Sequence, residues 1–94
     1  MKAQMFNERF WIRETDSSKL RYMFLKLLKK SGFKILGYKE HFFKPYGYSL
    51  IVLLSESHFA IHTFPEENKT YCELTSCVLD QFNNFLEHLN VEKV

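Results

Sequence analysis

Two serines, two histidines and two glutamates lie within the segment LSESHFAIHTFPE, at residues 54–66. These side chains supply nucleophiles, general bases and hydrogen-bond acceptors. A core strand rarely holds so many of them, because a polar group buried without a partner costs about 1–3 kcal/mol. The segment is therefore the first candidate for a reactive site.

The two histidines of this segment allow three interpretations. A shared metal ion is disfavoured, because His58 and His62 would lie about 13 Å apart along an extended strand. The second interpretation is that both are ordinary, partly exposed strand residues. The third is a nucleophilic pair in which His62 activates Cys77, if strand pairing sets His62 near the row of side chains that ends at Cys77. Spacing alone leaves the second and third open.

The elements that must position these groups follow the order strand, helix, four strands, helix. Asp16, Ser17 or Ser18 begins the first helix, and Gly32 follows its end. We expect one domain over residues 1–94, an α+β two-layer sandwich whose antiparallel sheet carries two helices on one face. The expected strands cover residues 4–13, 33–43, 48–55, 58–64 and 70–77, with turns at 44–47 and 65–69 and the second helix from residue 78.

Composition and charge exclude several classes of function. The net charge of +2 is too small to indicate a nucleic-acid-binding protein. The longest apolar run, residues 50–54, is too short to span a bilayer, and charges interrupt the N-terminal residues, so we expect a cytoplasmic protein without membrane contact. Cys72 and Cys77 would lie about 16 Å apart on one strand, which predicts free thiols.

A longer pattern resembles a known family. FFKPYGYSLIVLLSESHFAIHTFPE followed by ELTSC combines an aromatic residue, Pro-x-Gly-x-Ser, an apolar strand, Glu-Ser-His, Ile-His-Thr, aromatic-Pro-Glu, and an acidic residue four before a cysteine. This pattern, over residues 43–77, resembles the prokaryotic S-adenosylmethionine decarboxylases, which depend on a pyruvoyl group. Many residue types at fixed spacing make it far more specific than a lone short motif.

The resemblance implies a lyase made as a zymogen that cuts itself between Glu56 and Ser57. The hydroxyl of Ser57 would attack the carbonyl of Glu56, and elimination and hydrolysis would convert Ser57 into the pyruvoyl group. Ser49 and His62 would assist this processing. The substrate amine would then form a Schiff base with the pyruvoyl group, and Cys77 would donate the proton that replaces CO2. No metal is expected.

The implied substrate is S-adenosylmethionine, a sulfonium cation whose decarboxylated product feeds spermidine and polyamine biosynthesis. Phe43 and Phe64 match the aromatic positions of the family. The resemblance implies that they bind the substrate, because aromatic faces stack on adenine and attract cations. Glu66 matches a carboxylate that accepts hydrogen bonds from the ribose. His58 and Glu73 complete the expected substrate site.

The sequence departs from the family pattern at a few positions. Phe64 stands where Trp is frequent, Glu73 replaces Asp, and Val78 replaces Gly. Relatives continue into a further strand beyond the point where residue 94 falls, so this short variant is expected to differ at the sheet edge and in the dimer.

A homodimer of processed chains, with each site drawing on both subunits, is expected from the resemblance and from aromatic residues without intrachain cover. These are Tyr38, Phe42, Phe59 and Tyr71. Two alternatives remain open: a pyruvoyl-dependent arginine or ornithine decarboxylase on the same scaffold, and a regulatory or structural paralogue that never processes.

Overall fold

A computed structural model describes residues 3–94. Within these residues the chain forms five strands, two α-helices and one short 3-10 helix. In chain order they are β1 (Phe6–Ile12), α1 (Ser17–Lys30), β2 (Ile35–Phe42), β3 (Tyr48–Leu54), β4 (Ser57–Phe64), η1 (Pro65–Glu67), β5 (Lys69–Ser76) and α2 (Leu79–His88). The order confirms the expected elements, with strand ends displaced by a few residues.

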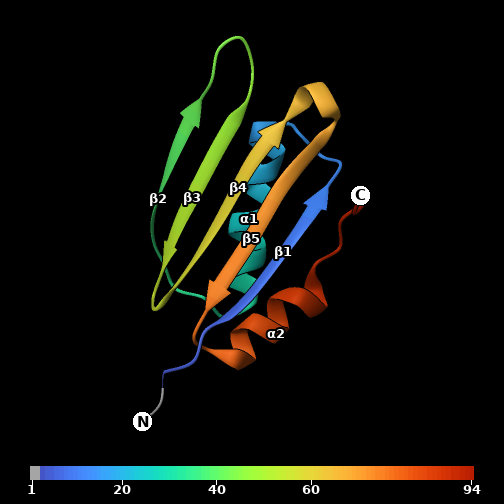
Figure 1. The fold of residues 1–94 in the computed structure, drawn as a ribbon. Helices are drawn as coiled ribbons and strands as arrows, with labels where there is room; N and C mark the ends of the chain where they lie inside the picture. Colours follow the sequence, from blue (N-terminus) through green and yellow to red (C-terminus); the bar gives the residue numbers. More distant parts are fainter. Residues whose placement is uncertain (1–2) are drawn as a thin grey trace.

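The strands form one sheet in the order β1-β5-β4-β3-β2, in which every neighbouring pair is antiparallel. Figure 1 shows α1 running behind the sheet, with α2 near the end where β5 finishes. The expected α+β two-layer sandwich is therefore confirmed. The face of the sheet away from the helices, called here the open face, carries no other element among the described residues.

The ends of α1 are fixed by local chemistry. Asp16 is its N-cap, since the carboxylate accepts a hydrogen bond from the Lys19 amide at 2.9 Å. Gly32 follows the helix with a φ of +101°, a left-handed conformation that glycine adopts without a steric penalty. Both features were expected from the sequence.

The core lies between the sheet and the helices. Phe59 of β4 is 0 % exposed, and its ring centroid lies 4.7 Å from that of Phe24 in α1 and 5.5 Å from that of Phe85 in α2. The prediction that Phe59 lacks cover is therefore wrong, because both helices pack against its face of the sheet. Tyr38 and Phe42 are exposed as expected, and Tyr71 is half-buried.

No helix of residues 3–94 has the length and apolar character needed to cross a membrane.

An ion pair ties α1 to β2 and predicts a pH dependence of stability. Arg21 Nη1 donates to Glu40 Oε1 at 2.7 Å, and the Tyr48 hydroxyl donates to the same oxygen at 2.8 Å. The hydrogen bond from Arg21 holds the pKa of Glu40 below its ordinary value of 4.5. The pair therefore stabilises the fold above about pH 4.5, and this stabilisation is lost as the pH falls through the lowered pKa.

We expect Glu40→Gln to lower the urea midpoint of unfolding at pH 7, with a difference from the parent chain that shrinks below pH 4.5. The matched control is Glu67→Gln, because Glu67 contacts Lys69 at 3.5 Å but its side chain is 59 % exposed. A Glu40→Gln difference that stays constant with pH would contradict the assignment.

Candidate functional site

One end of the sheet gathers five of the predicted site residues around a cavity of about 310 Å³. Phe43, Ser49, His62, Phe64 and Glu66 line it, together with three residues that were not predicted as site residues. Those three are Tyr46, Gly47 and Thr63.

A hydroxyl–imidazole pair lies at the floor of this cavity. Ser49 in β3 is the register partner of His62 in β4, and Ser49 Oγ lies 2.7 Å from His62 Nδ1. On the other side, the ring of Tyr71 in β5 stacks with the imidazole at 6.4 Å between centroids. His62 is thus held from both neighbouring strands, with Nδ1 engaged and Nε2 left for another partner. Such a histidine suits a general base.

The loop before β3 places the aromatic wall of the cavity. The Phe43 amide donates to the Gly47 carbonyl at 2.9 Å, which closes the loop. Gly47 has a φ of +119°, and a Cβ added there would lie 3.3 Å from Cβ of Phe43. Glycine is therefore required both by the backbone and by the closeness of Phe43.

An aromatic cluster that the sequence did not reveal adjoins the same end. Trp11 of β1 contacts Phe64, with 5.8 Å between ring centroids, and Tyr71, with 5.4 Å. The Lys69 ammonium lies 4.4 Å from the Trp11 ring centroid. Trp11 enters the cluster because β1, the first strand in the chain, pairs with β5, the last. The alternation of Asn7, Arg9 and Trp11 indicates that these side chains share one face of a strand. The sequence does not show which strand lies next to β1, so the contacts of Trp11 could not be predicted.

The expected cleavage point lies at the opposite end of the sheet. The two residues Ser55 and Glu56 form the turn between β3 and β4, and Ser57 is the first residue of β4. The Cys77 thiol donates to the backbone carbonyl of Glu56 at 3.3 Å and lies 3.7 Å from its carboxylate. The Ser57 hydroxyl donates to Ser76 Oγ at 2.7 Å, and Ser57 is only 6 % exposed.

Glu56 has a left-handed backbone conformation, with a φ of +62°. For a residue other than glycine this conformation costs about 1–2 kcal/mol. The strain is held at the residue whose carbonyl the Cys77 thiol contacts. Residues held in such conformations are frequent at functional sites.

Within one chain the two groups of site residues do not meet. Ser57 and His62 lie five residues apart on β4, which is about 16 Å, and their side chains point to opposite faces of the sheet. His62 pairs with Tyr71, which belongs to the row of Cys77, but Cys77 lies about 20 Å further along that row. A Cys77–His62 pair is therefore not formed within one chain.

The other predicted residues lie on or near the open face. His58 is exposed opposite Thr75, close to the cleavage point. Glu73 lies at mid-sheet opposite Ala60 and accepts a hydrogen bond from the Tyr71 hydroxyl at 3.1 Å. Burial raises the pKa of Tyr71, and the hydrogen bond to Glu73 raises it further.

Both cysteines are free thiols, as expected, but they differ in character. Burial raises the pKa of Cys72 to about 12, so this thiol is inert, whereas Cys77 is exposed. No cluster of three or more metal-ligating side chains occurs in the part of the chain from residue 3 onward.

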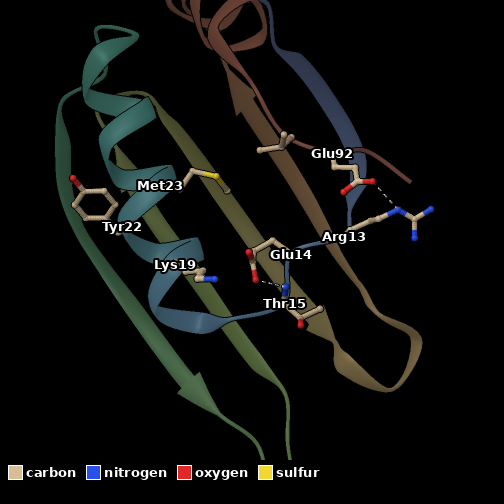
Figure 2. Close-up of a pocket in the computed structure, with 8 residues that line it drawn as sticks. Arg13, Glu14, Thr15, Lys19, Tyr22, Met23 and Glu92 are labelled. Carbon is tan, nitrogen blue, oxygen red and sulfur yellow. Dashed lines mark hydrogen bonds and ion pairs between the residues drawn. The ribbon is translucent and has the colours of Figure 1, made fainter.

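A larger cavity, of about 580 Å³, lies on the helix side between α1 and the C-terminal segment (Figure 2). Three of its charged groups are engaged: Arg13 Nε lies 3.6 Å from Glu92, and Glu14 accepts hydrogen bonds from the Thr15 and Asp16 amides. It contains none of the predicted site residues, and nothing in its lining indicates chemistry.

The fold and site define an α+β two-layer domain with a serine–histidine pair at one sheet end and a Glu-Ser turn beside a thiol at the other. A model of the S-adenosylmethionine decarboxylase family matches residues 13–92. The chain belongs to the S-adenosylmethionine decarboxylase family.

Individual relatives agree. The S-adenosylmethionine decarboxylase proenzyme 2 of Bacillus cereus is 39% identical over 62 residues, which cover 66% of this chain and 50% of that protein. The proenzyme of Pyrococcus horikoshii is 31% identical over 62 residues, covering 66% and 45%. The chain thus spans about half the length of the curated relatives it matches. The crystal structure of the adenosylmethionine decarboxylase from Aquifex aeolicus shares the fold, with a TM-score of 0.71 at 20% identity, covering 97% of this chain and 84% of that one.

The cavity loop yields a prediction with a matched control. Gly47→Ala forces a side chain into a left-handed position against Phe43, and we expect it to lower the free energy of unfolding by about 1–2 kcal/mol. Gly37→Ala is the control, because no atom lies within 4 Å of a Cβ added at Gly37. Urea unfolding measures both, and equal effects of the two substitutions would contradict the role given to Gly47.

Proposed function

We propose that this chain is the proenzyme of a pyruvoyl-dependent S-adenosylmethionine decarboxylase that cuts itself between Glu56 and Ser57. One observation carries the proposal: the carbonyl of Glu56, strained at φ +62°, accepts a hydrogen bond from Cys77 and is followed directly by the Ser57 hydroxyl. A nucleophile, a carbonyl to attack and a hydrogen-bond donor to its oxygen therefore lie together.

Cleavage would proceed without any co-reactant other than water. Ser57 Oγ bonds to the carbonyl carbon of Glu56, the C–N bond breaks, and the hydroxyl proton ends on the Ser57 nitrogen, which gives an ester. Loss of the Ser57 Cα proton then breaks the Cβ–O bond and releases Glu56 as a free carboxylate. Water replaces the nitrogen, ammonia leaves, and Ser57 has become a pyruvoyl group at a new chain end.

Two features of the turn would assist the first step. The thiol of Cys77, 3.3 Å from the Glu56 oxygen, stabilises the negative charge that develops there. The strain of the left-handed Glu56 is released once the chain is cut, so it favours the products over the intact peptide.

The residues present fit the group that would form. The pyruvoyl group supplies an electron sink for the loss of CO2. The exposed Cys77 lies beside this chain end and can hand a proton to the carbon that has lost CO2. Phe43 and Phe64 offer exposed rings to adenine and to the sulfonium cation, and Glu66 offers a carboxylate to the ribose hydroxyls.

A second copy of the chain would complete the site. Phe64 lies about 23 Å from Ser57 along β4, so one chain cannot bind a single substrate between its own two ends. A two-fold axis across the open faces would set the Ser49–His62 pair of the partner subunit against the Glu56–Ser57 turn. The open face offers an apolar contact for such a dimer, because Ile51 and Leu53 are 51 % and 56 % exposed there.

On the family resemblance, the product would serve spermidine synthesis in the cytoplasm. The rings of Phe43 and Phe64 can stack on adenine, which arginine and ornithine lack, and this supports S-adenosylmethionine as the substrate.

Self-cleavage is tested by mass spectrometry of the chain produced in the cell. We expect fragments of residues 1–56 and 57–94, with the second fragment beginning in a pyruvoyl group. Ser57→Ala should stay intact and folded, because it removes the nucleophile and buries no new atoms. A parent chain that remains a single intact mass under all conditions would refute the proposal.

The shared site is tested by mixing two inactive variants. Ser57→Ala lacks the residue that is cut, and His62→Ala lacks the proposed base. In mixed dimers, the Glu56–Ser57 turn of a His62→Ala chain would lie against the intact His62 of a Ser57→Ala chain. Co-expression should therefore yield cleavage of the His62→Ala chain only, accompanied by decarboxylation of S-adenosylmethionine.

Each variant expressed alone is the control and should remain uncut. If His62→Ala is cut by itself at the parent rate, or if co-expression yields folded mixed dimers without cleavage, the two-chain site is wrong.

A further inference from the structure

We propose that Ser76 is a positioning residue for self-cleavage, whose hydroxyl orients the Ser57 nucleophile. The inference rests on the proposed cleavage between Glu56 and Ser57. Ser76 is the last residue of β5 and is 0 % exposed; it lies within the ELTSC stretch, but the pattern gives it no role.

The position of the Ser76 hydroxyl is fixed independently of Ser57. Ser76 Oγ accepts a hydrogen bond from the Val78 amide at 3.0 Å and lies 3.5 Å from the Val78 carbonyl. The Val78 amide can only donate, so it holds one lone pair of Ser76 Oγ. The second lone pair faces Ser57, whose hydroxyl donates to it at 2.7 Å.

This geometry prepares Ser57 for attack in two ways. A serine side chain has three staggered rotamers, and the buried hydrogen bond selects one of them. It also directs the proton of Ser57 toward Ser76, which leaves the lone pairs of Ser57 Oγ free for the carbonyl carbon of Glu56. Because Ser57 and Ser76 are both buried, the bond is stronger than in water and no solvent molecule competes for it.

Ser76 and Cys77 hold the scissile peptide from two sides. Ser76 is the last residue of β5 and is buried, whereas Cys77 follows it in a bend and is exposed. Ser76 contacts the nucleophile, and Cys77 contacts the carbonyl oxygen that the nucleophile would convert to an oxyanion. The end of β5 therefore fixes both partners of the first bond-forming step relative to each other.

The Ser76 hydroxyl could instead serve only the stability of the strand end, since a buried hydroxyl needs a partner. The two roles differ in what they predict. A structural role lowers the stability of the fold in proportion to the lost hydrogen bond, whereas a positioning role lowers the rate of cleavage in a chain that is still folded.

The test compares Ser76→Thr with Ser76→Val, which have nearly the same shape and differ in the hydroxyl. The chains are made by cell-free synthesis, so that cleavage is followed from time zero by mass spectrometry. We expect Ser76→Val to cut about 10–100-fold more slowly than the parent, because the hydrogen-bond acceptor that orients the Ser57 hydroxyl is lost. Ser76→Thr should cut within about threefold of the parent. Threonine keeps the hydroxyl, and the largest expected cost is that its side chain must adopt one of three staggered rotamers to present that hydroxyl to Ser57.

Ser31→Ala is the matched control, because Ser31 is also buried and its hydroxyl donates to the Leu27 carbonyl at 2.7 Å, away from the cleavage point. It should lose stability but cut at the parent rate. Thermal unfolding of the same chains, in a Ser57→Ala background, separates stability from cleavage. If Ser76→Val does not unfold cooperatively, Ser76→Ala replaces it in the comparison with Ser76→Thr.

Parent-like or faster cleavage in Ser76→Val would overturn this inference while leaving self-cleavage intact. Slowing in Ser76→Thr equal to that in Ser76→Val would also overturn it, because the hydroxyl would then be irrelevant. A parent chain that is never cut would refute the proposed function and this inference together.

Discussion

The register of β4 between β3 and β5 is the constraint on which the rest of the site depends. One set of backbone hydrogen bonds places His62 between Ser49 and Tyr71 at one end, and Ser57 between Leu54 and Ser76 at the other. A slip by one residue would move every side chain of β4 to the opposite face, and would expose Phe59 and Ile61 to water. The burial of these apolar residues therefore maintains the alignment of the reactive ones.

The same strand separates the two groups of predicted site residues. The end at the Glu56–Ser57 turn holds a strained carbonyl, a thiol and a buried hydroxyl pair, whereas the end at the cavity holds aromatic rings, a carboxylate and the base. A rigid strand cannot bring its own two ends together, and the proposed dimer would unite them through a second copy. Two-fold symmetry would then make two equivalent sites from one surface.

Strain and hydrogen bonding have complementary roles at the turn. The left-handed conformation of Glu56 costs free energy that the surrounding sheet must supply, and the long antiparallel pairing of β3 with β4 supplies it. In the proposed self-cleavage, the contacts from Ser76 and Cys77 would orient the groups on either side of this strained peptide for attack by Ser57.

The sequence by itself determined the order of elements, the Asp16 cap, the turn at Gly32 and the residues of the decarboxylase pattern, because each depends on neighbours within a few positions. It also determined the distance between Ser57 and His62, because five residues of an extended strand span about 16 Å.

Only the tertiary structure decided which strands are neighbours, and with them the roles of Trp11, Ser76 and Phe59. Trp11 and Ser76 meet their partners across strands far apart in the chain, and the cover over Phe59 comes from both helices. Such contacts are fixed by the packing of the whole core, which no local pattern of residues encodes.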